Sequence, residues 1–553
     1  MLDVSAGLPR SWRRAHSWLL PLGIAATAVG LFAGYYRMAR TVLTTADSAG
    51  NALQAFDLIH GNPLLHGWTV SDVSFYGVEL FQFAAVERVI GLSPQVIPAS
   101  AALSYTLVVL LVAMLAWTGA TGTAGWLRSG LALSFVLVPQ PGLGQTILLS
   151  GPDHAGAAVP LLAGWLLLDR FADSRWLPYA LGAVLAWGQL ADPLLSLIGA
   201  VPLTLVCGVR AVRMGWHRRE GWRREAALAG CGLGSVLAGY GLVWTIGRLG
   251  GYRTQAVPTG LLSWDQLGAH LRTTGASVAV LFGCHFPELH GWLDRGLGVV
   301  HLLGVGLVVL ALARTVRLAW RGAGNRTDQV IAAGILLNLV AFVVSALNTD
   351  LLASHEIAPV LPLSAVLVAR AWLGSADRPP AWLRLPSWSA PVRAAVALAV
   401  AGVLAATVVE QLSRPPIKPS AGAVADWLAA QHLNYGLGGY WVANNITVDS
   451  GGAVRVAPLN GRTRITGYRW ESRSDWYDPA KHDARFIVLQ LNSPGFFTVE
   501  TAIGQFGSPV ARVTLPTSSG GSATVLVYDR NLLIGLAAWC APGREAPSMA
   551  QCD

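Results

Sequence analysis

Long apolar segments recur along this chain from about residue 18 to residue 412, and they constrain its fold more than any other feature. Each approaches the roughly twenty residues that a helix needs to cross the hydrocarbon core of a membrane. Of the 553 residues, 53% are hydrophobic and only 12% are charged, which is about half the charged share of an average soluble domain. A single soluble core could not bury so many such segments. The sequence therefore predicts an α-helical polytopic membrane protein.

These segments predict about eleven transmembrane helices. The expected spans lie near 18–36, 99–118, 129–149, 155–169, 177–191, 194–212, 226–246, 297–314, 329–347, 357–373 and 394–412. Residues 1–412 then form the membrane domain, and a long mixed segment at about 37–98 forms its first outer loop.

Arginine residues cluster between alternate apolar segments. The largest groups lie near 10–14, 210–224, 314–326 and 370–393. Arginine enrichment in cytoplasmic loops is the usual topological signal of multi-pass proteins. We therefore expect a plasma-membrane protein with a cytoplasmic N-terminus, and an odd number of spans places the C-terminal segment outside. The net charge of +9 follows from this pattern and does not indicate a nucleic-acid partner.

The sequence changes character after about residue 412. A proline-rich linker at 414–419 precedes an expected amphipathic helix at 421–432. Short β-type segments follow at 439–448, 453–458, 484–491, 510–515 and 523–529. Residues 413–553 are therefore predicted to form an extracytoplasmic α/β domain.

Five cysteines are too few for a disulfide scaffold. Cys540 and Cys552 bracket a short loop in the C-terminal domain, and an oxidising compartment favours a disulfide between them. Cys207, Cys231 and Cys284 lie in or near apolar segments and are expected to be packing residues.

Asp47 lies just past the first expected span, ahead of a short helix in the first outer loop. A carboxylate at the membrane surface can act as a general base on a hydroxyl group or hold a divalent cation. It can also cap a helix that begins at Ser48, and the residues alone do not decide between these roles. Further along the loop, residues 75–91 are expected to form an amphipathic helix at the interface.

This arrangement resembles the GT-C superfamily of membrane glycosyltransferases, which use polyprenyl-phosphate sugars. The resemblance rests on the many spans and on the position of Asp47 in the first outer loop. It implies that Asp47 is catalytic, that the donor is a polyprenyl-phosphate sugar, and that the acceptor is a cell-envelope glycan, lipid or protein. The sequence at 439–447 also resembles the tails of actinobacterial proteins with this layout.

Asp153 and His154 lie between two spans on the same expected face as Asp47. They could join Asp47 around a divalent cation (Mg²⁺, Mn²⁺ or Ca²⁺) or around the donor phosphate. Both could instead cap the helix that follows, and Asp192, at another outer span end, is expected to be a cap.

Four further residues are candidates for contact with the donor phosphate or the substrate. Arg253 and Arg272 lie in the long outer segment, where a cation could neutralise a departing phosphate, although each is also typical of an ordinary interfacial arginine. His355 and Glu356 precede a proline-spaced helix, at a position where many GT-C relatives carry an Arg-Tyr pair. Capping and interface roles remain open for both.

Aromatic residues are frequent in the predicted C-terminal domain. Trp441, Trp470 and Trp476 could stack on the sugar rings of an acceptor glycan, or they could belong to the core of the domain.

Together these features predict an inverting membrane glycosyltransferase with Asp47 as its general base. A transporter or flippase of lipid-linked saccharides is an alternative, but it would place functional polar groups at mid-membrane. A non-catalytic envelope-assembly protein that binds through its C-terminal domain is a second alternative. The ionisable residues concentrate at the expected outer ends of the spans, which favours surface chemistry.

Overall fold

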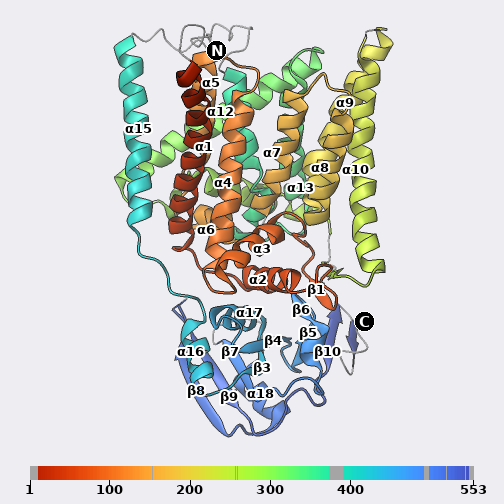
Figure 1. The fold of residues 1–553 in the computed structure, drawn as a ribbon, viewed down its shortest axis with the longest axis vertical. Coiled ribbons are helices and arrows are strands. Elements are labelled where there is room, and N and C mark those ends of the chain that lie inside the picture. Colours follow the sequence, from red (N-terminus) through yellow and green to blue (C-terminus); the bar gives the residue numbers. More distant parts are fainter. Residues whose placement is uncertain are drawn as a thin grey trace.

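The computed structural model describes residues 10–151, 154–218, 220–255, 257, 260–372, 390–490, 497–518, 520–541 and 544–546. The chain forms a bundle of long helices with a mixed α/β domain packed against one end (Figure 1). It is a polytopic membrane protein with a C-terminal α/β domain, as the sequence predicts.

Among the described residues, six helical segments are long and apolar enough to cross a membrane. They are Val96–Trp117, Ser196–Trp216, Trp222–Arg248, Asp294–Trp320, Arg326–Val344 and Leu352–Trp372. Shorter apolar helices lie beside them in the bundle (Figure 1). The bundle helices are α1 (Arg10–Ala39), α4 (Val96–Trp117), α5 (Gly122–Val136), α6 (Leu143–Leu149), α7 (His154–Arg170), α8 (Leu177–Ala191), α9 (Val201–Trp216, preceded by the π-helix Ser196–Ala200), α10 (Trp222–Arg248), α11 (Leu267–Phe282), α12 (Trp292–Trp320), α13 (Arg326–Val344), α14 (Val360–Trp372) and α15 (Ala390–Ser413).

The bundle departs from the predicted spans at two places. The expected span at 129–149 is broken between α5 and α6, where Pro139, Pro141 and the positive-φ Gly142 interrupt the helix. The helix α11 lies in the outer segment for which no span is predicted. Its first turns carry His270 and Arg272, so that its 16 residues contain no long apolar run.

The first loop contributes three short elements at the end of the bundle that faces the C-terminal domain (Figure 1). They are α2 (Ala46–Ile59), β1 (Trp68–Val70) and α3 (Glu79–Ile90). The predicted amphipathic helix at 75–91 corresponds to α3, which buries Leu80, Phe83 and Ala84 and exposes Val89 and Ile90.

The C-terminal domain is built on an eight-stranded mixed sheet in the order β11-β10-β5-β4-β3-β7-β9-β8. The central strand β3 pairs in parallel with β4 and β7, and β9 pairs antiparallel with β7 and β8. The elements of the domain are α16 (Gly422–Ala430), β3 (Tyr435–Gly439), α17 (Tyr440–Asp449), β4 (Arg455–Asn460), β5 (Thr466–Tyr468), β6 (Ser472–Arg473), β7 (Phe486–Gln490), α18 (Val499–Phe506), β8 (Ala511–Pro516), β9 (Ser522–Val527), β10 (Ala538–Ala541) and β11 (Arg544–Ala546).

The strand predicted at 439–448 is wrong, because most of this segment is the helix α17. Its Tyr, Val, Ile and Thr residues favour a strand. In the structure, however, α17 packs between the sheet and α2, and it buries residues on more than one face, including Val442, Ala443 and Ile446. Burial from both sides outweighs the weak local propensity.

The C-terminal domain and the first loop share one hydrophobic core. A single buried cluster contains Leu53 and Phe83 of the first loop together with Leu437 and Ile487 of the domain. A small sheet in the order β2-β1-β6 also joins them. In it, β1 pairs in parallel with β2 (Arg253–Thr254) and antiparallel with β6. The domain is therefore docked on the membrane bundle through both packing and backbone hydrogen bonds.

Cys207, Cys231 and Cys284 are free cysteines, two of them buried, in agreement with a packing role. The predicted disulfide of Cys540 with Cys552 lies outside the described residues, because Cys552 is not among them.

Candidate active site

Asp47 lies in the first turn of α2, at the end of the bundle that carries the C-terminal domain. The N-cap of this helix is Thr45, whose side-chain oxygen accepts a hydrogen bond from the Ser48 N–H at 3.0 Å. The capping role that the sequence left open for Asp47 therefore belongs to Thr45, and the Asp47 carboxylate is available for other contacts.

Two aromatic side chains of the C-terminal domain bond this carboxylate. Tyr440, the first residue of α17, donates its hydroxyl hydrogen to Asp47 Oδ1, and Trp470 donates a second hydrogen bond. Burial raises the pKa of the Asp47 carboxyl above its ordinary value, while the two hydrogen bonds and the nearby His355 oppose that rise. A carboxylate with a raised pKa is a stronger proton acceptor.

Glu471 is a second carboxyl group beside Asp47, and it is fully buried. It accepts a hydrogen bond from Asn51 Nδ2 at 3.3 Å and lies 3.2 Å from the Tyr440 hydroxyl. Burial and the neighbouring Asp47 raise the pKa of Glu471 well above its usual range. Gly50 permits this close approach, because a Cβ at that position would overlap the Glu471 carboxyl.

A cluster of histidine and acidic side chains lies where α7, α8 and the 3-10 helix Leu352–Ile357 meet. His154 Nδ1 is 2.7 Å from Asp192 Oδ2, and His154 Nε2 is 3.2 Å from Glu356 Oε2. His355 Nε2 is 3.6 Å from Glu356 Oε1, and its ring stacks on that of His154 with centroids 5.6 Å apart.

The hydrogen bonds of the two histidines decide which ring nitrogens carry lone pairs. His355 Nδ1 lies 2.8 Å from the Leu352 carbonyl, which can only accept, so this nitrogen donates. Asp192 likewise takes the Nδ1 hydrogen of His154. In the neutral rings both Nε2 lone pairs then face the Glu356 carboxylate. A positive charge between these groups, either a proton or a metal ion, would stabilise the arrangement.

The same cluster has the geometry of a metal-binding group. Among the described residues, His154, His355 and Glu356 form such a group. Each offers one ligand atom, and these three atoms lie within 4.8 Å of one another. Two imidazoles and one carboxylate favour Zn²⁺ or Mn²⁺, whereas Mg²⁺ and Ca²⁺ prefer sites made of oxygen atoms. Asp192 orients the outer nitrogen of His154, as second carboxylates do for many metal-ligating histidines.

The carboxylate pair and the histidine cluster belong to one region. His355 is close enough to Asp47 to act electrostatically on its carboxyl group. Asp72 of the first loop interacts electrostatically with His154 and with Glu471. The structure thus places Asp47, His154 and His355 in one region, while Asp153 lies outside the described residues.

The predicted phosphate-binding arginines lie apart from these groups. Arg253 is an exposed residue of β2, where it pairs with Thr69 of β1, and Arg272 is an exposed residue of α11. Within the described ranges, neither forms a hydrogen bond or ion pair with Asp47 or with the histidine cluster.

The three tryptophans suggested for glycan stacking differ in their surroundings. Trp441 is 46% exposed beside Tyr440. Trp470 is partly exposed and lies parallel to the ring of Tyr468. Trp476 is buried against Trp68 with ring centroids 5.2 Å apart, so its ring belongs to the core and we do not propose that it stacks on a sugar.

Tyr440, Glu471 and Asp192 are site residues whose roles sequence reasoning did not identify. Tyr440 is one of many aromatic residues in the C-terminal domain, and Glu471 lies 420 positions after its partner Asn51, with no local pattern that links them. Asp192 does bond the Leu194 N–H at 2.8 Å as expected of a cap, and it also binds His154. The sequence therefore predicts the capping role of Asp192 but not its hydrogen bond with His154.

No family model matches this chain, and no curated protein matches it. Among solved structures it is similar to ArnT from Cupriavidus metallidurans in the apo state, with a TM-score of 0.50 and 13% sequence identity over 93% of this chain and 98% of that one. It also matches an oligosaccharyltransferase of Archaeoglobus fulgidus in complex with Zn and sulfate, with a TM-score of 0.44 and 11% identity over 81% of this chain and 64% of that one. The likeness to ArnT shows that this chain and ArnT share an overall fold.

Proposed function

We propose that this chain is a membrane glycosyltransferase of the GT-C type that uses Asp47 as its general base. The donor would be a polyprenyl-phosphate sugar, and the acceptor a hydroxyl group of a cell-envelope glycan, lipid or protein on the outer face of the plasma membrane. The observation that carries the proposal is the contact of Asp47 with Tyr440 and Trp470, close to His355. A partly buried carboxylate at a domain junction is suited to removing a proton from a bound hydroxyl group.

The proposed reaction is a single displacement with inversion at the anomeric carbon. Asp47 takes the proton of the acceptor hydroxyl group while its oxygen bonds the anomeric carbon. The bond from that carbon to the phosphate oxygen breaks, and the polyprenyl phosphate leaves with the electron pair. Tyr440 and Trp470 orient the Asp47 carboxylate through their hydrogen bonds.

The histidine cluster would oppose the negative charge on the departing phosphate. His154 and His355 can do so as imidazolium groups, or they can hold a divalent cation together with Glu356. Such an ion, when bound, would supply Lewis-acid stabilisation of the phosphate oxygens. The donor set makes Zn²⁺ or Mn²⁺ our first expectation for its identity.

The C-terminal domain would take part in the reaction directly. It supplies Tyr440, Trp470 and Glu471 to the surroundings of Asp47, and the exposed ring of Trp441 lies beside them. We propose that Trp441 and Trp470 contact the acceptor glycan. Arg253 and Arg272 remain candidates for longer-range contact with the donor phosphate.

A cell-envelope glycan profile tests the proposed function. A strain that lacks the gene would be complemented with wild type, Asp47→Ala or Asp265→Ala, the last being an exposed carboxylate in the outer segment. We expect wild type and Asp265→Ala to restore the missing glycan and Asp47→Ala to fail. Restoration by Asp47→Ala at an equal protein level would remove the catalytic role of this residue and favour transport or assembly instead.

A further inference from the structure

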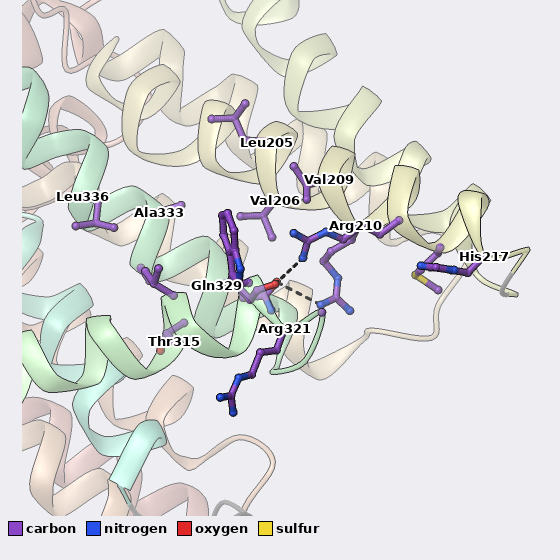
Figure 2. A pocket seen from close by; sticks show the side chains of 17 residues that line it. Leu205, Val206, Val209, Arg210, His217, Thr315, Arg321, Gln329, Ala333 and Leu336 are labelled. Atoms are coloured by element: carbon purple, nitrogen blue, oxygen red, sulfur yellow. Dashed lines mark hydrogen bonds between the residues drawn. The ribbon is translucent and has the colours of Figure 1, made fainter.

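A groove of about 790 Å³ lies between α9, α12 and α13, at the end of the bundle opposite the C-terminal domain (Figures 1 and 2). It is far along the helices from Asp47 and takes no part in the proposed reaction. Its lining residues come from the last turns of α9 and α12 and the first turns of α13.

One part of the groove is apolar and open. Leu205, Val209, Val316 and Leu336 line it and are 52%, 51%, 47% and 39% exposed. These side chains lie on helices that are long and apolar enough to span a membrane, so the groove opens toward hydrocarbon. Open apolar walls of this kind match an acyl chain, because a small hydrophilic ion gains nothing from them.

The other part of the groove is basic. Arg210, His217 and Arg321, which Figure 2 labels, line it together with Arg213. No acidic residue is among its described lining residues. The basic part therefore presents a positive surface next to the apolar walls.

The arginines differ in how far their charge is already paired. Arg210 donates to Glu225 at 3.1 Å and to Gln329 at 3.3 Å, and Glu225 is shared with Arg326. Arg213 donates to the Ala319 carbonyl at 2.6 Å and pairs with no carboxylate among the residues that the structure describes. Arg321 forms no ion pair with any residue that the structure describes. Arg213 and Arg321 are therefore the groups suited to an incoming anion.

Two tryptophans mark the level of this basic part in the membrane. Trp216 ends α9 and is 83% exposed, and Trp320 ends α12 and is 82% exposed. Exposed tryptophans at helix ends are typical of the interface where lipid headgroups lie. Arg213 lies in the last turn of α9, and Arg321 is the C-cap residue directly after Trp320. Their guanidinium groups therefore lie at headgroup level, while the apolar walls extend toward the membrane interior.

We propose that this groove binds a membrane lipid with an anionic phosphate headgroup. The phosphate would contact Arg213 and Arg321, and one acyl chain would lie along Leu205, Val209 and Leu336. Basic pockets between transmembrane helices recognise anionic lipids in this way, and a bidentate guanidinium is well suited to a phosphate. The proposal does not depend on the proposed glycosyltransferase activity.

Native mass spectrometry of the purified full chain tests the proposal. The detergent-solubilised protein would be titrated with palmitoyl-oleoyl phosphatidylglycerol, with the phosphatidylcholine of the same chains, or with inorganic phosphate. We expect phosphatidylglycerol to bind about tenfold more tightly than phosphatidylcholine, and the variant Arg213→Gln/Arg321→Gln to lose about that factor, since a charge-assisted hydrogen bond is of this order.

Two further variants separate lipid binding from general charge and from misfolding. Arg223→Gln removes an exposed arginine at the same end of the bundle but outside the groove, and should bind phosphatidylglycerol as wild type does. Ala333→Leu narrows the groove and leaves the arginines in place, and should weaken lipid binding. Equal binding of the two lipids, an undiminished double variant, an equal loss in Arg223→Gln, or equally tight binding of inorganic phosphate would each overturn the proposal.

Discussion

Tyr440 donates a hydrogen bond to Asp47, a residue that lies 393 positions earlier in the chain. The contact joins α17 of the C-terminal domain to α2 of the first loop, and the two helices pack against each other. The C-terminal domain, which the sequence predicts on the same side of the membrane as Asp47, therefore donates a hydrogen bond to the Asp47 carboxylate. This contact makes the domain part of the candidate site.

Replacing Tyr440 with Phe should move the acid limb of the activity profile to higher pH. The hydrogen bond from Tyr440 stabilises the ionised form of Asp47 and so lowers the pKa of its carboxyl group. Its loss raises that pKa, and less of the base is ionised at a given low pH. At pH values below the midpoint of this limb, we expect Tyr440→Phe to be about tenfold less active than wild type, which corresponds to the loss of one charge-assisted hydrogen bond.

The rate of sugar transfer measured against pH gives the test for Tyr440→Phe. Tyr435→Phe is a matched control, because it removes a partly buried hydroxyl of the same domain that donates to the Trp476 carbonyl at 2.6 Å. The control should keep the wild-type limb. An unchanged limb in Tyr440→Phe would show that Asp47 is not the group that titrates in the rate.

Removal of ligands from the histidine cluster should weaken metal binding. We expect the full chain to bind one Zn²⁺ or Mn²⁺ with His154, His355 and Glu356, and His154→Ala to reduce the affinity strongly. Asp192→Asn keeps the ligand but weakens its orientation, so the affinity should fall by about 10–100-fold. Titration calorimetry on metal-free protein measures both changes.

The exposed His290 provides the control for metal binding. His290→Ala should bind as wild type does, and chelation should lower the transfer activity of both proteins. If neither metal binds to wild type, or if His154→Ala binds with unchanged affinity, the cluster is an ion-pair network in which protons supply the positive charge.

The docking of the C-terminal domain depends in part on a half-buried ion pair. Arg473 Nη1 is 2.7 Å from Asp57 Oδ2, with side-chain exposures of 27% and 18%. Arg473→Ala should destabilise the docked domain by about 1–3 kcal/mol, between the values for exposed and for buried pairs. Hydrogen exchange of the β1 and β6 amides measures the loss, because those strands pair across the junction.

A double-mutant cycle with Asp57→Ala isolates the contribution of this pair. Arg485→Ala serves as its control, since the Arg485–Asp483 pair is exposed on the domain surface and should leave exchange at β1 unchanged. Additive effects of Asp57→Ala and Arg473→Ala would mean that the pair itself does not stabilise the junction.

The sequence predicts the membrane bundle well because spanning helices must be long and apolar. Both properties can be recognised from the residues of each segment alone. The break at Pro139 and Pro141 and the helix α11 are the exceptions. The prolines divide an otherwise apolar run, and α11 carries polar side chains that hide it from a search for apolar segments.

The candidate site is only partly predictable for a different reason. Asp47 and His154 stand at the ends of expected spans, where position alone draws attention to them. Glu471 has no such signal, since its role depends on a tertiary contact with Asn51 and on the space left by Gly50. The residues of α17 predict a strand for the same reason. The burial of this helix between α2 and the sheet is not visible in its own residues.

Asp449 gives the C-terminal domain a pH-dependent stability. It is the last residue of α17, and its Oδ2 accepts a hydrogen bond from the Ala421 N–H at 2.8 Å. Burial raises the pKa of the Asp449 carboxyl to about 7, the nearby Asp426 adds to the rise, and the hydrogen bond opposes it. The folded domain therefore binds this proton more tightly than the unfolded chain does.

Asp449→Asn should flatten the pH dependence of stability between about pH 4 and pH 7. For a carboxyl whose folded pKa is raised, the stabilisation is fully present below the unfolded pKa and is lost as pH rises through the folded one. Wild type should thus lose about 1–3 kcal/mol across this range, whereas Asn stays neutral and still accepts the Ala421 hydrogen bond. The two proteins should unfold alike at pH 4, and the variant should be the more stable at pH 8, as measured by thermal unfolding of the full chain in detergent.

Asp483→Asn, at an exposed position of the same domain, should follow wild type. Parallel curves for wild type and Asp449→Asn would show that Asp449 is ionised throughout the range.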